Sequence, residues 1–257
     1  SVMVPVALCD TVVVSDAPEL EVVHMPTLEV APERTTVWRA VTLLAEALGE
    51  RPEVRVEVTA RIPEKAGLGG SSADAGAVLR ALCERWGVSV CDERVVAVAR
   101  RVGADVAFFL DPRPGLYLGA GDVLERTFPE FSMPVALVMP AVGGVSTKEA
   151  YDEFDRAGED PASYEVVCEA LAAGDVAAMA ANLFNNLAPA ACHLCGDVWA
   201  VSEWLAGQEG VAASMVTGSG ACSFAICESG DAAERIAEAA REHHGWRAWA
   251  AVAGGAE

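Results

Sequence analysis

A glycine-rich turn interrupts the run Ile62-Pro63-Glu64-Lys65-Ala66-Gly67-Leu68-Gly69-Gly70-Ser71-Ser72-Ala73-Asp74-Ala75-Gly76-Ala77-Val78-Leu79. Before it, residues 54–60 alternate apolar side chains with charged or polar ones, which is the pattern of a half-buried strand. After it the chain continues as a helix, with Ser72 or Asp74 as the predicted N-cap. The apolar face of this helix is expected to comprise Ala77, Val78, Ala81 and Leu82. The sequence therefore predicts a strand, a tight turn and a helix in direct succession.

Three glycines of the turn, Gly67, Gly69 and Gly70, favour the binding of an anion. Because they lack Cβ atoms, the backbone turns sharply and approaches a ligand closely, while amide N–H groups and the helix dipole point at it. A triphosphate fits such an environment. The spacing matches neither a P-loop, which ends in Gly-Lys-Ser/Thr, nor the dinucleotide-binding fingerprint. A purely structural left-handed connection is the alternative to a phosphate site.

The overall charge argues against binding to a nucleic-acid backbone. Among 257 residues, 38 are acidic and 18 are basic, which gives a formal net charge of −20. Such a surface repels polyanions. No uncharged apolar stretch reaches the length of about 18 residues that a membrane span requires, and no signal-peptide pattern opens the chain. We therefore expect a cytoplasmic protein that binds neither nucleic acid nor membranes.

Lysine occurs only at Lys65 and Lys148, so a phosphate site in this chain must rely mainly on backbone N–H groups, a metal ion and arginine. Codon bias is the alternative explanation for the scarcity of lysine. The eight cysteines are scattered through apolar runs, which favours free, buried thiols. Cys192 and Cys195 have the spacing of half a zinc or redox site, but no second half-site with suitable spacing follows.

The order of the expected elements favours an α+β fold, because strands and helices do not alternate strictly. Residues 128–134 form a Pro-containing connector, which divides the chain into predicted domains 1–130 and 131–257. Residues 108–121, rich in glycine and proline, are expected to form a turn and a hairpin. Strands are expected at 12–14, 21–23, 54–60, 135–139, 211–216 and 222–227. Helices are expected at 36–48 and 92–102, from residues 148, 163, 175 and 192, and near the C-terminus, where a last strand follows.

Three further segments carry candidate functional residues. Asp105 lies between a helix end and a hydrophobic run, where a carboxylate is able to accept the proton of a substrate hydroxyl, as kinases require; a turn cap beside Gly103 is the alternative. The small-residue turn at 217–224 either closes a hairpin or packs beside the first glycine-rich turn around one ligand. The segment 145–151 begins a helix capped by Ser146 or Thr147.

Taken in chain order, these segments resemble the GHMP family of small-molecule kinases, in which a Pro-x-x-x-Gly-Leu-Gly-x-Ser-Ser-type loop wraps the phosphates of ATP. The resemblance runs from Met3 to about Phe224. It implies a two-domain α+β fold, with a ribosomal protein S5 domain 2-like N-terminal domain, an α/β C-terminal domain and the active site in the cleft between them. The first strand of the family would precede Ser1, so we expect the chain to be a truncated or incompletely represented product.

The resemblance also implies a role for each matched residue. Asp105 is the implied catalytic base near the acceptor hydroxyl, and Thr147 is an implied substrate-binding residue. The implied reaction transfers the γ-phosphoryl group of ATP, with Mg²⁺ as cofactor and no metal ligand assigned, to the 2-hydroxyl of 4-diphosphocytidyl-2-C-methyl-D-erythritol. The implied third motif, which supports the loop, comprises Gly218, Ser219 and Gly220. The implied ATP-binding residues, here called the phosphate loop, are Pro63, Glu64, Lys65, Ala66, Gly67, Leu68, Gly69, Gly70, Ser71, Ser72 and Ala73.

The chain departs from the family pattern at several positions. The family's Pro-Ala-Lys and Asp-Gly-Tyr-His segments, which supply a lysine beside the catalytic acid and two cytidine contacts, would lie before Ser1. Thr35 replaces an Asn, and the segment 185–189, Asn-Asn-Leu-Ala-Pro, replaces Asn-Asp-x-Glu-Pro. Two alternatives therefore stay open: a non-catalytic nucleotide-binding relative, and a kinase for homoserine, mevalonate or a sugar. We expect a monomer or a homodimer.

Overall fold

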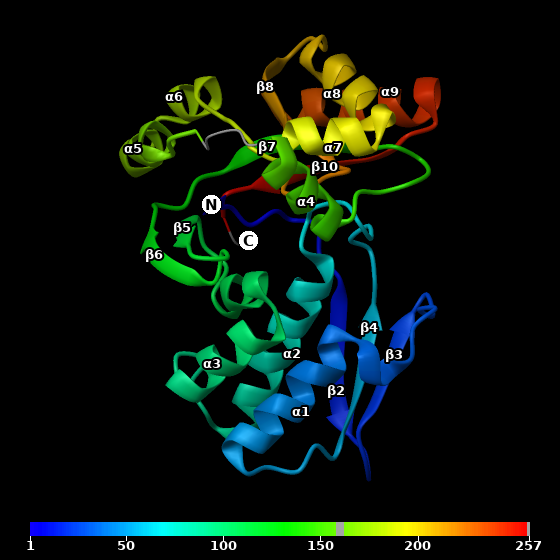
Figure 1. The fold of residues 1–257 in the computed structure, drawn as a ribbon, viewed down its shortest axis with the longest axis vertical. Coiled ribbons are helices and arrows are strands. Elements are labelled where there is room, and N and C mark those ends of the chain that lie inside the picture. Colours follow the sequence, from blue (N-terminus) through cyan, green and yellow to red (C-terminus); the bar gives the residue numbers. More distant parts are fainter. Residues whose placement is uncertain (158–161, 256–257) are drawn as a thin grey trace. The chain divides into compact units, whose positions relative to one another are not determined.

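The structure is a computed structural model that describes residues 1–157 and 162–255, and it has the predicted α+β composition (Figure 1). The chain divides into two compact units. The first contains Ser1, Leu8–Ile62 and Gly69–Thr127, and the second contains Val2–Ala7, Pro63–Leu68 and the chain from Phe128 onward. The domain boundary after residue 130 stays a prediction. The predicted second domain, 131–257, includes residues 158–161 and 256–257, which lie outside the described residues.

The first unit is built on a three-stranded sheet of β2 (Thr11–Asp16), β4 (Val54–Thr59) and β3 (Glu21–Met25), in that order. The central strand β4 pairs antiparallel with β2 and parallel with β3. Along β4 the valines are buried while Arg55 and Glu57 remain partly exposed, so the predicted two-residue period is confirmed. On the exposed side, Arg55 pairs with Glu57 and with Glu21.

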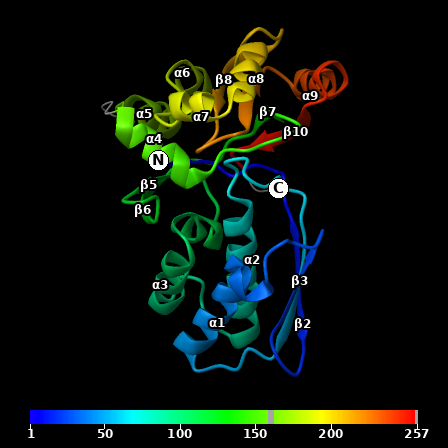
Figure 2. The ribbon, with the colours of Figure 1, turned by 45° about the vertical axis from the view of Figure 1, so that its right-hand side comes forward.

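Three helices complete the core of this unit, two of them beside the sheet and the third packed on those two, as both ribbon views show (Figures 1 and 2). They are α1 (Thr36–Leu48), α2 (Gly70–Trp86) and α3 (Glu93–Val102). The bounds of α1 match the prediction, because Thr35 caps its first turn and Gly49 ends it in the left-handed region. The cap of α3 is Asp92, whose side chain accepts a hydrogen bond from the Arg94 amide. The core includes Leu44, Val56, Val58, Leu79, Leu82 and Val98.

The remaining elements of the first unit are two 3₁₀ helices and a β-hairpin. A 3₁₀ helix, η2 (Ala104–Leu110), follows α3, and an antiparallel hairpin follows η2. The prediction of a turn and a hairpin at residues 108–121 is confirmed in part. Residues 108–110 complete η2, and the first strand of the hairpin begins at Gly115. Its strands are β5 (Gly115–Leu118) and β6 (Val123–Thr127), and a further 3₁₀ helix, η1 (Pro32–Arg34), precedes α1.

The second unit is built on a four-stranded sheet in which each neighbouring pair is antiparallel. The order of its strands is β10 (Arg247–Ala253), β7 (Met133–Met139), β9 (Ser223–Cys227) and β8 (Val211–Val216). Two helices, α8 (Gly196–Ala206) and α9 (Gly230–His244), pack on this sheet through a core that includes Val201, Leu205 and Ile236. Short strand β1 (Val2–Met3) belongs to the same unit.

Four shorter helices complete the second unit: α4 (Thr147–Ala157), α5 (Glu165–Ala173), α6 (Val176–Ala181) and α7 (Ala188–Leu194). The helix predicted from Cys192 is wrong in its start, because Cys192 lies in the last turn of α7. Cys195 adopts extended backbone angles and separates α7 from α8. The extended backbone at Cys195 (φ −142°) therefore divides the stretch 188–206 into two helices.

All eight cysteines are unpaired, and four of them, Cys83, Cys168, Cys222 and Cys227, are buried. Within residues 1–157 and 162–255, no group of three or more His, Cys, Asp or Glu side chains is arranged to hold a metal ion. Over the same residues, no helix combines the length and the apolar character needed to cross a bilayer.

Replacement of Leu79 tests the core of the first unit, because this side chain is fully buried between helices and sheet. We expect Leu79→Ala to lower the free energy of unfolding by about 2–5 kcal/mol, the range for a cavity left by a buried leucine. Leu124→Ala is the matched control, since Leu124 is 48% exposed and its loss should cost about 0.5 kcal/mol or less. Equal losses in urea denaturation would contradict the assigned core.

Candidate functional site

The phosphate loop leaves the first unit after Ile62 and returns to it at Gly69, where α2 begins. Three of its residues adopt left-handed backbone angles: Lys65 (φ 53°), Gly67 (φ 71°) and Gly69 (φ 70°). Left-handed angles are readily adopted by glycine and cost energy at other residues. Alternate left-handed residues coil the backbone tightly, which explains the glycines at 67 and 69.

Backbone hydrogen bonds join the loop to the turn between β8 and β9, within the second unit. The Ala221 amide donates to the Lys65 carbonyl (3.0 Å), and the Cys222 amide donates to the Ala66 carbonyl (3.1 Å). The Thr217 hydroxyl donates to the Gly67 carbonyl (3.2 Å). The two small-residue turns singled out from the sequence are therefore in direct contact.

This contact is too close for a side chain at either glycine that faces it. A Cβ atom on Gly67 would lie 2.2 Å from the Thr217 carbonyl oxygen, and a Cβ on Gly218 would lie 2.9 Å from the Gly67 carbonyl oxygen. Both separations are below van der Waals contact. Gly67 and Gly218 are required by the packing of two backbones, in addition to their left-handed angles.

Side chains of the second unit hold the turn at 217–222 from its other side. Ser219 is buried, and its hydroxyl lies 3.0 Å from that of Thr147, at the start of α4. Asn185 donates both amide hydrogens, one to the Val216 carbonyl and one to the Gly218 carbonyl, each at 2.8 Å. Sequence reasoning missed this role of Asn185. The available signal was chemical, since a side-chain amide carries two donors and suits two neighbouring carbonyls.

The first turn of α2 begins without a side-chain cap. Gly69 occupies the N-cap position in the left-handed region, and no side chain there accepts a hydrogen bond. The prediction that Ser72 or Asp74 caps this helix is therefore wrong, because both residues lie inside it. Leading amide N–H groups of a helix have no intrahelical acceptor and attract anions. The start of α2 is further fastened by Thr36, whose hydroxyl donates to the Ser71 carbonyl (2.8 Å).

The apolar face predicted for α2 is buried in part. Val78 and Leu82 lie in the core, whereas Ala77 and Ala81 are only partly buried. These two alanines line a surface hollow together with Asp10 and residues of β2.

Asp105 lies in the first turn of η2, within the first unit. Its side chain is exposed, and no hydrogen bond or ion pair involves it among the described residues. The alternative of a turn cap has no support, since the start of η2 has no side-chain cap. Partial removal of water by the surrounding protein raises the pKa of Asp105 above its ordinary value. A carboxylate with free lone pairs and a raised pKa is suited to accept a proton.

Packing brings η2 against the N-terminal part of α2. A Cβ on Gly69 would lie 3.2 Å from the Phe109 ring, and a Cβ on Gly76 would lie 2.4 Å from the Phe109 Cβ. At the start of η2, a Cβ on Gly103 would lie 4.0 Å from the Ser72 hydroxyl oxygen. The segment that carries Asp105 is therefore held close to the open end of α2.

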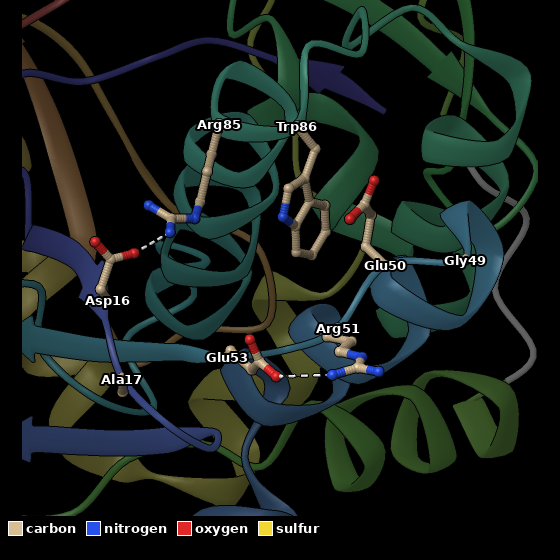
Figure 3. Close-up of a pocket in the computed structure, with 8 residues that line it drawn as sticks. All are labelled: Asp16, Ala17, Gly49, Glu50, Arg51, Glu53, Arg85 and Trp86. Atoms are coloured by element: carbon tan, nitrogen blue, oxygen red, sulfur yellow. Dashed lines mark hydrogen bonds and ion pairs between the residues drawn. The ribbon is translucent and has the colours of Figure 1, made fainter.

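A separate hollow of the first unit contains none of the predicted site residues. It is lined by residues around Trp86 at the end of α2 and by the segment between α1 and β4 (Figure 3). Its two arginines are each paired, Arg85 with Asp16 and Arg51 with Glu53. With both cations neutralised, this hollow offers little to an anionic ligand.

Comparison with known proteins gives two matches to family profiles and a large set of relatives. Residues 35–111 match the GHMP kinases N terminal domain, and residues 168–245 match the GHMP kinases C terminal domain. A protein of Desulfitobacterium hafniense (strain Y51), named 4-diphosphocytidyl-2-C-methyl-D-erythritol kinase, is 34% identical over 215 residues, covering 81% of this chain and 73% of the relative.

A relative of the same name from Mycolicibacterium gilvum (strain PYR-GCK) is 36% identical over 248 residues, covering 90% of this chain and 74% of its own length. Among solved structures, a crystal structure of 4-(cytidine 5'-diphospho)-2C-methyl-D-erythritol kinase matches with a TM-score of 0.80 and 32% identity. The match covers 98% of this chain and 89% of that chain.

Replacement of Gly67 tests the contact between the two turns. We expect Gly67→Ala to weaken the binding of ATP, the ligand that the resemblance implies, by roughly tenfold or more, because the new Cβ displaces the loop backbone. Gly174→Ala is the matched control, since Gly174 has a similar φ of 67° but no atom within 4 Å of the added Cβ. Calorimetric titration should show unchanged affinity in the control. Similar affinities for both variants would overturn the steric argument.

Proposed function

Because the chain belongs to the GHMP kinase family, we propose that it transfers the γ-phosphoryl group of ATP to the 2-hydroxyl of 4-diphosphocytidyl-2-C-methyl-D-erythritol. The reaction belongs to the non-mevalonate isoprenoid pathway. The names of the curated relatives and of the matching crystal structure support this acceptor. The observation that carries the proposal is the coiled glycine loop, hydrogen-bonded to the turn at 217–222 and continued by an uncapped helix.

In the proposed complex, the phosphate loop binds the triphosphate mainly through backbone N–H groups. The chain has two lysines, and Lys148 is paired with Asp152 on α4. Lys65 lies in the loop itself, where its carbonyl accepts the Ala221 amide. Backbone donors that are already fixed in space need no rearrangement when charge develops on the transferred group. Positioning and electrostatics then supply most of the rate enhancement.

Asp105 is the proposed general base. Its unpartnered carboxylate accepts the proton of the acceptor hydroxyl as the oxygen attacks the γ-phosphorus, and ADP leaves. Partial removal of water by the surrounding protein shifts its pKa upward, toward the range in which proton transfer at neutral pH is efficient.

The turn at 217–222 and α4 complete the proposed site in the second unit. Gly218, Ser219 and Gly220 support the loop, and Thr147 binds substrate. The hydrogen bond between the Thr147 and Ser219 hydroxyls supports this assignment, because it fixes the direction in which the Thr147 oxygen presents its remaining donor or acceptor.

Mg²⁺ is proposed to accompany ATP and to offset charge between the phosphates. Magnesium is commonly held by one or two carboxylates together with substrate phosphates, so the lack of a three-ligand cluster among the described residues fits an ion that arrives with the nucleotide. We also propose that the enzyme acts in the cytoplasm as a monomer or homodimer.

Replacement of Asp105 tests the proposed base. Asp105→Asn should lower kcat by about 100-fold or more, because the amide cannot accept the proton, while ATP affinity and the circular dichroism spectrum remain unchanged. Asp111→Asn is the control, since Asp111 lies just after η2 and pairs with Arg113. Wild-type turnover by Asp105→Asn on the complete gene product would reject this role.

The pH dependence of kcat gives a second test of the base. Asp105 must be ionised to act, so kcat should fall as the pH decreases through its pKa. Because partial removal of water raises that pKa, the midpoint of the acid limb should lie above the ordinary aspartate value of about 4. A midpoint at or below that value, in initial rates with saturating substrates, would argue against Asp105.

A panel of acceptors tests the proposed substrate. We expect ADP release with 4-diphosphocytidyl-2-C-methyl-D-erythritol. The value of kcat/KM should be at least about 100-fold lower with homoserine, mevalonate or galactose, because these molecules lack the nucleotide portion that positions the acceptor hydroxyl. Preference for one of these would replace the proposed acceptor. ATP binding without turnover of any acceptor would instead favour a non-catalytic relative.

A further inference from the structure

Asp74 is a buried acid that the proposed phosphoryl transfer does not use. It lies in the second turn of α2, and only 8% of its surface is exposed. Among the described residues, its Oδ1 atom is fully buried and meets no hydrogen-bond donor. An ionised carboxylate in such a place is unfavourable, because burial without donors removes the water that would solvate it.

The acid that faces Asp74 is Asp10, which precedes β2. The Oδ1 atom of Asp10 accepts hydrogen bonds from the amides of Arg61 (2.5 Å) and Ile62 (2.7 Å). Both amides follow β4 and stand directly before Pro63, the first residue of the phosphate loop. These two hydrogen bonds tie the Asp10 carboxylate to the backbone that leads into the loop.

Burial, the charge of Asp10 and a hydrogen bond to Asp10 raise the pKa of Asp74 to about 8. Helices α1, α3 and η2 and strand β2 pack against α2. Among the described residues of these elements, no charged side chain shifts the pKa of Asp74 in addition to Asp10. Arg80 and Glu84, one positive and one negative, line the hollow beside Asp10. At neutral pH, Asp74 therefore carries a proton and is a donor to Asp10.

We propose that Asp74 and Asp10 share a single proton and act as positioning residues for the phosphate loop, an inference that rests on the proposed function. The proton of Asp74 holds Asp10, and Asp10 in turn holds the amides at 61 and 62. The point where the loop enters α2 lies beside the same residues, since a Cβ on Gly70 would be 3.1 Å from the Ile62 Cγ2 atom. The pair therefore fixes the loop where it begins and ends.

Loss of the shared proton to solvent at alkaline pH leaves two carboxylates in contact. Their repulsion moves Asp10 away from the amides of Arg61 and Ile62, and the first residues of the loop lose their anchor. The consequence is weaker binding of ATP, with no direct effect on the proton transfer assigned to Asp105.

The KM for ATP as a function of pH tests this inference in the complete gene product. For the wild type we expect KM to rise roughly tenfold between pH 7 and 9.5, the size of one lost charge-assisted hydrogen bond. Asp74→Asn donates from its amide at every pH, so its KM should match the wild type at pH 7 and stay constant. Asp74→Ala lacks the donor and should have a raised KM throughout.

Asp92→Asn is the control, because Asp92 is a partly exposed helix cap whose pKa is lowered to about 2, chiefly by its hydrogen bonds to Arg94. This variant should keep the alkaline rise. An alkaline rise that persists in Asp74→Asn would overturn the inference, as would an Asp74→Ala enzyme with the wild-type KM at pH 7. If Asp74→Ala fails to fold, the asparagine variant still decides.

A measurement without ATP separates this inference from the proposed function. The amide resonance of Ile62, followed by NMR, should titrate with a midpoint near pH 8 in the wild type and should not titrate in Asp74→Asn. If it titrates but ATP does not bind, the acid pair stands and the kinase proposal fails. If ATP binds and the resonance is unchanged across pH 7–9.5, the acid pair fails and the kinase proposal stands.

Discussion

Two backbone hydrogen bonds, from the amides of Ala221 and Cys222 to the carbonyls of Lys65 and Ala66, hold the glycine loop in its coiled form. Fixing left-handed angles at positions 65, 67 and 69 costs conformational entropy, and at Lys65 it also costs backbone strain, so hydrogen bonds to another segment are needed to keep them populated. The segment 217–222 supplies these hydrogen bonds. It is itself held by side-chain hydrogen bonds with Asn185 and Thr147. The proposed phosphate site depends on this chain of contacts.

The sequence predicted the elements of the fold well wherever a local pattern determined the outcome. The helix at Thr36–Leu48 has a capping threonine and a terminal glycine, and the strand at Val54–Thr59 has a strict two-residue alternation. The family resemblance was confirmed as well. The contact of the two glycine-rich turns was anticipated as one of two possibilities, since both are rich in residues that let backbones approach.

Other features depended on contacts that no local pattern reveals. Ser72 and Asp74 looked like helix caps, but Gly69 is left-handed and starts the helix earlier. The fold buries Asp74 beside an acid that lies 64 positions away in the chain, which no local pattern indicates. Asn185 lies in a segment that departs from the family pattern at its neighbours Asn186 and Ala188, and no local pattern reveals that its amide joins two carbonyls more than 30 residues further on. Each outcome follows from residues distant in sequence.

The residues 63–68 belong to the second unit although they are flanked in the chain by the first. The carbonyls of Lys65, Ala66 and Gly67 accept hydrogen bonds from a segment synthesised some 150 residues later. During translation, the loop must therefore wait without those partners until the ribosome has released Cys222. Dividing the gene near residue 127 would place the loop and its donors on separate polypeptides, so the coiled loop would form only when the two products associate.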